Sequence, residues 1–184
     1  MNKIRSVCVF CASSELVDDV FKNTALELGR KLAKSGLSLV YGGASIGLMG
    51  CVARGVHEEK GRVTGVLPEF FKSKHIEYSE ADELIVTRDM RERKAMMDKR
   101  SDAFIVLPGG VGTLEEAMEI ISMRQLGLTD KPLVFINTNG FYEALRANIL
   151  EMVDLDFAKP NILDLFEMVP DPNSALDYLF HHFN

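Results

Sequence analysis

The strongest constraint on the fold is the regular alternation of short apolar runs with longer stretches of helical periodicity. The runs are nearly continuous in Val, Ile, Leu and Phe, as in parallel strands covered on both faces. The predicted strands are Ile4–Phe10, Leu37–Tyr41, Val63–Leu67, Glu83–Thr87, Ala103–Leu107 and Pro132–Asn137. The predicted helices are Val17–Ser35, Ile46–Lys60, Met90–Arg100, Thr113–Leu126 and Phe141–Val153. This order predicts an α/β fold, a Rossmann-like doubly wound parallel sheet.

The chain is short enough to form one domain. Its 184 residues contain no linker, repeat or low-complexity tract, so we expect residues 1–184 to share a single core. The tail after Pro160 is expected to form one or two helices. In that tail, Leu176, Leu179 and Phe180 should pack back onto the rest of the domain.

The charge of the chain narrows the choice of partners. The net charge is -6, which argues against a general nucleic-acid binder, and no apolar run approaches the roughly 18 residues of a membrane helix. Residues 151–184, with seven acidic side chains and one basic, account for the whole net charge. A basic island lies upstream, formed by Arg88, Arg91, Arg93, Lys94, Lys99 and Arg100. A local positive site in an acidic protein favours a small anionic ligand.

The three cysteines do not suggest a disulfide framework. Cys8, Cys11 and Cys51 are few and odd in number, which fits a reducing compartment and predicts a cytoplasmic protein. The Cys8-x-x-Cys11 pair could be a redox motif, but Cys8 falls inside a strand, so a structural role is favoured. No metal is expected, because the histidines lack ligand spacing beside the cysteines. They are His57, His75, His181 and His182.

Loops at the carboxyl ends of the strands are where such a fold binds ligands. The loop after the first strand carries Ser13 and Ser14, either of which could cap the next helix. The loop after the second strand carries Gly42 and Gly43, without the Lys of a P-loop or the spacing of a dinucleotide fingerprint. For this second loop, a purely structural turn is as reasonable as a binding loop.

The loop after the Ala103–Leu107 strand gives the clearest signal. It reads Pro108-Gly109-Gly110-Val111-Gly112-Thr113 and leads into a helix. With Thr113 as N-cap, the backbone N–H groups of Gly110, Gly112 and Thr113 would form an anion site at the helix start. Glu116 could be only the carboxylate of a capping box. Since a capping box does not need the glycines that precede it, we favour a ligand site.

The segment Met90–Arg100 precedes that strand and holds most of the basic island. One interpretation is an amphipathic helix with a solvated charged face and with Met90, Met97 and Met96 in the core. That interpretation does not explain why Arg93 and Lys94 lie near a helix start, where positive charge opposes the helix dipole. An anionic ligand shared with the glycine loop would offset this cost.

These two motifs together resemble a family signature. Met90-x-x-Arg93-Lys94 followed by Pro108-Gly109-Gly110-x-Gly112-Thr113-x-x-Glu116 is similar to the pattern of the LONELY GUY proteins. These are cytokinin riboside 5'-monophosphate phosphoribohydrolases, often labelled as lysine decarboxylases. The resemblance covers nearly the whole chain, including Phe10–Ser14, Tyr41–Gly43 and Gly127–Pro132, although Ala12 stands where the family usually has glycine. It also implies an acidic ligand contact upstream of Met90, for which Glu77 and Glu80 are among the choices.

The resemblance implies a Rossmann-like homodimer with active sites near the dimer interface and no metal or organic cofactor. It implies hydrolysis of the N-glycosidic bond of a purine nucleoside 5'-monophosphate, of cytokinin type or AMP, to free base and ribose 5-phosphate. Arg93 and Glu116 are the expected catalytic residues. The expected substrate-binding residues are Ser13, Gly43, Met90, Lys94, Pro108, Gly109, Gly110, Val111, Gly112, Thr113 and Glu115.

The residues fit that chemistry. Cleavage of the C–N bond builds positive charge on the ribose, which Glu116 can stabilise while it orients water. Consecutive helix residues diverge by about 100 degrees, so Glu115 and Glu116 cannot both point inward, and Glu116 is the one expected to turn toward the loop. Arg93 would orient the base or Glu116 and, with Lys94, hold the nucleotide.

Two other functions remain open. The first is a nucleotide or cofactor carrier of the same fold that does not hydrolyse its ligand. The second is a decarboxylase, which needs pyridoxal phosphate on a lysine, and no lysine of the chain has a context that supports it.

Overall fold

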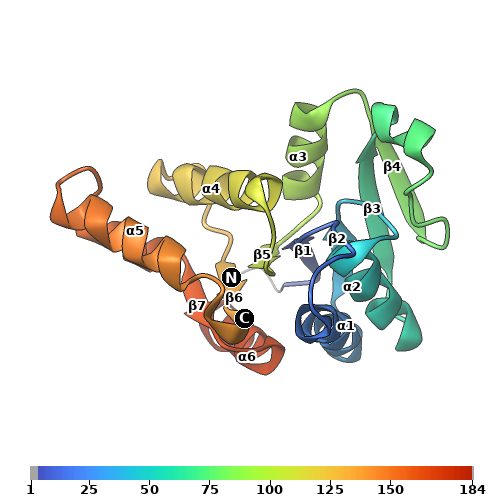
Figure 1. Ribbon diagram of the computed structural model, residues 1–184, viewed down its shortest axis with the longest axis horizontal. Coiled ribbons are helices and arrows are strands. Elements are labelled where there is room, and N and C mark those ends of the chain that lie inside the picture. Colours follow the sequence, from blue (N-terminus) through green and yellow to red (C-terminus); the bar gives the residue numbers. More distant parts are fainter. Residues whose placement is uncertain (1–3, 184) are drawn as a thin grey trace.

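The computed structural model describes residues 4–183 and contains one sheet of seven parallel strands (Figure 1). Their order across the sheet is β4-β3-β2-β1-β5-β6-β7. The strands are β1 Ser6–Phe10, β2 Ser38–Tyr41, β3 Val63–Pro68, β4 Glu83–Thr87, β5 Ala103–Val106, β6 Leu133–Ile136 and β7 Glu167–Val169. The doubly wound fold predicted from the sequence is confirmed.

Six α-helices of the described chain cover the two faces of the sheet. The helices whose side chains enter one core are α1 Asp19–Lys34, α2 Gly47–Glu58 and α6 Pro172–Phe183. Those whose side chains enter the other are α3 Met90–Lys99, α4 Val111–Gln125 and α5 Glu143–Asp154. Short 3-10 helices span Glu69–Lys74, Thr138–Gly140 and Pro160–Leu165. No helix within residues 4–183 has the length and apolar character needed to cross a bilayer.

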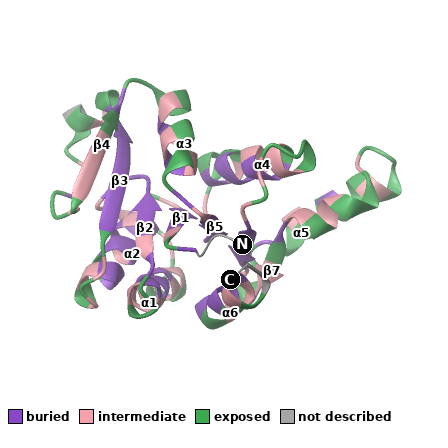
Figure 2. Cartoon of the chain, turned by 180° about the vertical axis from the view of Figure 1, so that it is seen from behind, coloured by how far each residue is buried: buried purple, intermediate pink, exposed green. Residues whose placement is uncertain are grey.

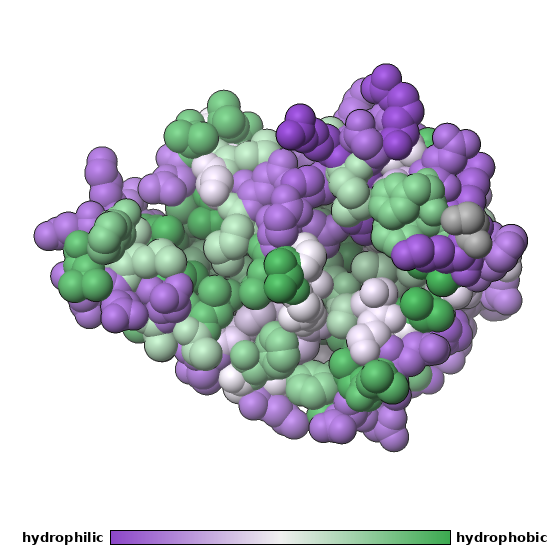
Figure 3. Space-filling view, turned by 45° about the horizontal axis from the view of Figure 1, so that its top comes forward, coloured by the Kyte–Doolittle hydropathy of each residue, from purple (hydrophilic) through white to green (hydrophobic). Residues whose placement is uncertain are grey.

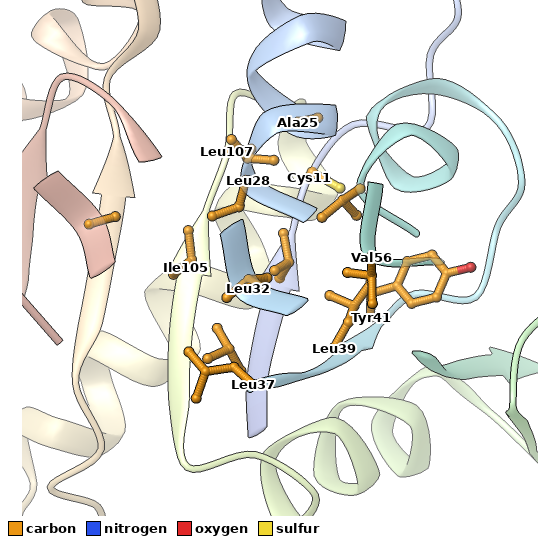
Figure 4. Packing of buried hydrophobic residues seen from close by; sticks show 14 of the residues in the cluster. Cys11, Ala25, Leu28, Leu32, Leu37, Leu39, Tyr41, Val56, Ile105 and Leu107 are labelled. Atoms are coloured by element: carbon orange, nitrogen blue, oxygen red, sulfur yellow. The ribbon is translucent and has the colours of Figure 1, made fainter. Parts of the chain in front are cut away.

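The strands supply the two cores alternately, as the pleat of a strand requires. Val7 and Val9 of β1 join the core under α1 and α2, whereas Cys8 and Phe10 join the core under α3 and α4. Leu28 and Leu32 of α1 pack in the first core beside Leu39 and Ile105 (Figure 4). The central strands are therefore buried on both faces (Figure 2), which is why their sequences read as continuous apolar runs.

The end of the chain differs from the prediction. Helix α6 forms, and Leu176 and Leu179 are buried while Phe180 packs against the same core, as expected. The sequence analysis missed β7, which pairs with β6 through Ile136 and Val169. This strand has only three residues, none of them buried, so it leaves no apolar run in the sequence.

Helix α4 begins two residues earlier than predicted. Its N-cap is Gly110, in an extended conformation, and no side chain caps the helix start. The prediction that Thr113 is the N-cap is therefore wrong. Glu116 consequently lies in the second turn of α4, so it is not at the N3 position and is not the carboxylate of a capping box.

The strand order reverses at β1, because successive strands are added first on one side of it and then on the other. Strands β2, β3 and β4 build outward on one side of β1, and β5, β6 and β7 build outward on the other. The loops after β1 and β5 therefore leave the sheet side by side, and Ala12 N donates to Pro108 O over 3.3 Å. In open α/β sheets the ligand crevice lies at this switch point.

Candidate active site

A cavity of about 320 Å³ opens at the carboxyl ends of the strands, beside the switch point. This volume is typical of small-molecule sites. Its polar part is lined by Ser13, Ser14, Gly110, Gly112, Thr113, Glu115 and Glu116. Its other lining residues are Cys11, Ala12, Gly42, Ala44, Met49, Leu67, Phe71, Ile76, Met90 and Arg93.

The start of α4 forms the polar end of the cavity. The first N–H groups of a helix have no partner within the helix, and their dipoles point toward a bound anion. A Cβ atom built on Gly110 or Gly112 would meet nothing within 4 Å, so the backbone here is open to a ligand. Gly109 differs, because a Cβ there would lie 2.1 Å from Thr113 Oγ1. Thr113 thus packs over Gly109 and fixes the shape of the loop.

Arg93 reaches the cavity from α3. The side chain of Asp89 caps this helix by accepting from Glu92 N over 2.8 Å, which places Arg93 one turn into the helix. Arg93 is only 5% exposed, and its Nε donates to Val66 O of β3 over 3.1 Å. The guanidinium also lies against Gly42, where a Cβ would be 2.3 Å from Arg93 Nη2. The glycine after β2 therefore leaves room for the arginine.

Glu116 meets Arg93 inside the protein. Arg93 Nη1 donates to Glu116 Oε1 over 2.5 Å, and Glu116 is also 5% exposed. Burial raises the pKa of Glu116 above the ordinary glutamate value, while the Arg93 guanidinium opposes the rise. The cavity therefore contains a buried carboxylate whose pKa depends most on two opposing influences, its burial and its contact with Arg93. Such pairs in clefts are frequent at active sites.

Glu115 and Lys94 form a separate set of ion pairs. Lys94 Nζ contacts Glu115 Oε1 and also Glu119 Oε2, the latter at 2.6 Å. Lys94 does not line the cavity, whereas Glu115 does. Glu116 is buried and pairs with Arg93, whereas Glu115 is exposed and pairs with Lys94, although both residues line the cavity. The expected role of Lys94 in holding the nucleotide has no support in this geometry.

The basic island is largely neutralised by carboxylates. Besides Arg93 and Lys94, Arg88 pairs with Glu92 at 3.0 Å and Arg100 pairs with Glu83 at 3.0 Å. The positive charge noted in the sequence therefore holds α3 to its neighbours. Only at Arg93 does it also reach the cavity.

The expected substrate-binding residues divide into two groups. Ser13, Met90, Gly110, Gly112, Thr113 and Glu115 line the cavity together with Arg93 and Glu116. Gly43, Lys94, Pro108, Gly109 and Val111 do not line it. Met90 is 38% exposed, so its assignment to the core is wrong, whereas Met97 is buried as expected and Met96 packs against the core. The side chain of Val111 is 84% exposed and does not belong to the cavity lining.

Gly43 has a structural role. Its φ of +78° is a left-handed conformation that favours glycine, and its carbonyl accepts from Tyr78 N over 2.9 Å. The neighbouring Gly42, not Gly43, lines the cavity. Glu77 and Glu80, the acidic residues considered for a ligand contact, also lie outside the lining. The Tyr78 hydroxyl donates to Glu80 Oε2 over 3.1 Å.

The sequence analysis did not find the apolar part of the cavity. Leu67, Phe71 and Ile76 come from the end of β3 and the connection to β4, and Met49 comes from α2. The clearest signal in the sequence is the pair of adjacent rings, Phe70-Phe71, in a segment rich in charged residues. Nothing in that signal shows which of the two rings faces the cavity.

The burial of Cys8 and Cys11 agrees with the structural role favoured for this pair, although Cys11 also lines the cavity. Cys8 and Cys11 are fully buried, and burial raises the pKa of both thiols well above the ordinary value. A thiol that stays protonated is a poor nucleophile and a poor metal ligand. Among residues 4–183, no three His, Cys, Asp or Glu side chains gather in a way that could hold a metal ion.

The fold and the site define a class: a doubly wound α/β protein with an open helix start and a buried Arg–Glu pair at the switch point. The family described as "Possible lysine decarboxylase" matches residues 49–179. The cytokinin riboside 5'-monophosphate phosphoribohydrolase LOG5 of Arabidopsis thaliana is 42% identical over 178 residues, which cover 97% of this chain and 78% of the relative. The probable phosphoribohydrolase LOGL2 of Oryza sativa subsp. japonica is 40% identical over 97% of this chain and 73% of its own. The chain belongs to the LONELY GUY family.

Solved structures share the fold at lower identity. The molybdenum cofactor binding protein of Rippkaea orientalis superposes with a TM-score of 0.76 at 21% identity and covers 99% of both chains. The molybdenum cofactor carrier protein of Chlamydomonas reinhardtii gives a TM-score of 0.71 at 21% identity over 97% of both chains. At this identity the likeness extends to the fold alone.

Proposed function

We propose that this protein hydrolyses the N-glycosidic bond of a purine nucleoside 5'-monophosphate, of cytokinin type or AMP, to free base and ribose 5-phosphate. The observation that carries the proposal is the buried contact of 2.5 Å between Arg93 and Glu116, on the wall of a cavity that also contains the open start of α4. Curated relatives about 40% identical over nearly the whole chain are named as phosphoribohydrolases of this kind.

The 5'-phosphate binds at the start of α4. The backbone at Gly110 and Gly112 is open, and Thr113 and Ser13 add hydroxyl groups to the same end of the cavity. A helix start stabilises an anion through its N–H groups and its dipole. The phosphate therefore fixes one end of the substrate and sets the position of the ribose relative to Glu116.

Glu116 acts on the sugar. As the C–N bond breaks, the anomeric carbon becomes electron-poor, and an ionised carboxylate beside it stabilises that charge and orients a water molecule. Arg93 favours the ionised form of Glu116, because its guanidinium opposes the rise that burial causes in the pKa of that carboxyl group. The hydrogen bond from Arg93 Nε to Val66 O also fixes the orientation of the guanidinium group.

A carrier function explains less of the site. A carrier needs the phosphate-binding helix start but gains nothing from a buried carboxylate that opposes an anionic ligand.

A decarboxylase needs a neutral lysine for its Schiff base. Burial tends to lower the pKa of Lys94, but its hydrogen bonds to Glu115 and Glu119 raise it overall above the ordinary lysine value. This shift is opposite to the one that a Schiff-base lysine requires.

We also propose that the protein forms a homodimer. Helix α5 projects from the sheet (Figure 1), and apolar side chains gather over α5 and the end of α4 at the left of Figure 3. These exposed residues are Leu126, Leu128, Leu150, Met152, Leu155 and Phe157, the last being 84% exposed. A patch of this kind marks an interaction surface. Light scattering coupled to size exclusion should give twice the chain mass of 20.5 kDa, and a monomer would contradict the proposal.

The direct test is an activity assay. Purified protein is incubated with AMP or with isopentenyladenosine monophosphate, and the free base is separated and quantified by chromatography. Release of adenine or isopentenyladenine with an equal amount of ribose 5-phosphate supports the proposal. Binding of either nucleotide with no base released would contradict it and favour the carrier.

A further inference from the structure

The connection between β3 and β4, residues 69–82, forms one wall of the cavity. We call it the β3–β4 strap. Phe71 and Ile76 of the strap belong to the apolar lining of the cavity, with Leu67, Met49 and Met90, whereas the start of α4 belongs to its polar lining. A nucleotide bound with its phosphate at α4 therefore presents its base, the least polar part, to the strap.

Backbone contacts attach the middle of the strap to the loop after β2. Ile76 O accepts from Ser45 N over 2.7 Å and from Ser45 Oγ over 3.0 Å. Tyr78 N donates to Gly43 O over 2.9 Å, and an isolated antiparallel bridge joins Ala44 to Glu77. These contacts join the strap to a loop whose Gly42 and Ala44 also line the cavity.

A side-chain cluster attaches the end of the strap to the last turn of α2. His57 Nδ1 lies 3.0 Å from the Tyr78 hydroxyl, and His57 Nε2 lies 3.3 Å from Asp82 Oδ2. The Asp82 carboxylate also accepts from Val63 N over 2.7 Å, a bond that lowers the pKa of Asp82. Burial, followed by the hydrogen bond to Glu80, raises the pKa of Tyr78 to about 12, so its hydroxyl keeps its proton. His57 thus joins two residues of the strap that lie four positions apart.

We propose that His57 is a positioning residue for the base end of the substrate: through Tyr78 and Asp82 it fixes the strap, and through the strap it fixes the wall formed by Phe71 and Ile76. His57 does not line the cavity and touches no reacting atom. The inference rests on the proposed hydrolase function, because it assigns the two ends of the same cavity to the two ends of the nucleotide.

The test separates the two ends of the site. His57→Ala should raise KM for isopentenyladenosine monophosphate about three- to tenfold, the effect of losing one hydrogen-bonded attachment. It should leave kcat within about twofold, because Arg93 and Glu116 are untouched. The inhibition constant of ribose 5-phosphate, which has no base, should stay unchanged. A matched control is Glu58→Gln, which removes the adjacent ion pair of α2 with Arg30 at 2.5 Å and should change neither constant.

Tyr78→Phe keeps the buried ring and removes only the hydroxyl that contacts His57 and Glu80. It should reproduce the rise in KM, and the double variant should be no worse than the larger single effect, because both changes break the same attachment. The inference is overturned if KM does not change, if KM and the ribose 5-phosphate constant rise together, or if the two single effects add. Absence of base release by the unaltered protein would instead remove the proposed function, and the inference with it.

Discussion

Gly112 offers a prediction in which stability and substrate binding change in opposite directions. A Cβ atom at this position meets no protein atom within 4 Å, so Gly112→Ala introduces no clash. The residue lies in the first turn of α4, where alanine is favoured over glycine by roughly 0.5–1 kcal/mol. For a chain of this size, we expect the melting temperature to rise by about 1–4 °C.

The same methyl group should weaken substrate binding. Gly112 lines the cavity, so the added carbon occupies space that a phosphate oxygen needs to reach the helix N–H groups. Losing one charge-assisted hydrogen bond costs about 1.5–3 kcal/mol, which corresponds to a roughly 10- to 150-fold rise in KM. The effect on kcat should be small, because the contact is made equally in the ground state and the transition state.

The assay is the initial rate of base release against nucleotide concentration, together with a thermal melt of the same sample. Ser122→Ala, at the other end of α4, is the control and should leave KM unchanged, since its hydroxyl donates to Met118 O of its own helix and Ser122 does not line the cavity. A Gly112→Ala variant that melts at or above the parent temperature and has the parent KM would refute a phosphate site at the start of α4.

Two further predictions concern Arg93. Because Glu116 must be ionised to stabilise the sugar cation and burial raises its pKa, kcat/KM should fall on acidification at a pH above the ordinary glutamate pKa of about 4.3. In Arg93→Gln, which removes the opposing cation at Glu116, this acid limb should move to higher pH, and a limb that stays in place would contradict the coupling. Gly42→Ala places a carbon 2.3 Å from Arg93 Nη2, so the guanidinium must leave one of its buried acceptors. For Gly42→Ala we expect the free energy of unfolding, measured by denaturant titration, to fall by about 1–3 kcal/mol. We also expect kcat, measured by base release, to fall at least tenfold. Parent-like values of both would show that Arg93 can move freely.

Features that depend on local periodicity could be read from the sequence. The core strands and the five helices of the first 154 residues were predicted to within two residues at each end, because parallel strands and amphipathic helices impose distinct spacings. Strand β7 could not be found in this way. Its existence depends on the free edge of β6, which is a property of the sheet and not of residues 167–169.

The error at α4 has a physical cause in packing. The sequence suggests Thr113 as the cap, because threonine is a good N-cap residue. In the structure Thr113 is 5% exposed and packs over Gly109, so its side chain is not available to cap a helix. Gly110 in an extended conformation begins the helix in its place.

The site was predicted in part. Two compact motifs could be found in the sequence, because the residues of each lie close together along the chain. One contains Arg93, and the other contains the glycines and Glu116. The partners of Lys94 could not, since Glu115 and Glu119 meet it only when α3 and α4 pack together. The wall of Phe71 and Ile76 is likewise created by the position of the strap over β2 and β3.

The most direct test of the central claim is single-turnover release of base by Glu116→Gln, compared with Glu119→Gln, whose carboxylate pairs with Lys94 and does not line the cavity. Glutamine keeps the size of the buried side chain and can still contact Arg93, but it carries no charge toward the sugar. Glu116→Gln should slow base release by about 100- to 1,000-fold while the nucleotide still binds, and Glu119→Gln should keep the parent rate. Equal rates for the parent and Glu116→Gln would remove the carboxylate from the mechanism and contradict the central claim.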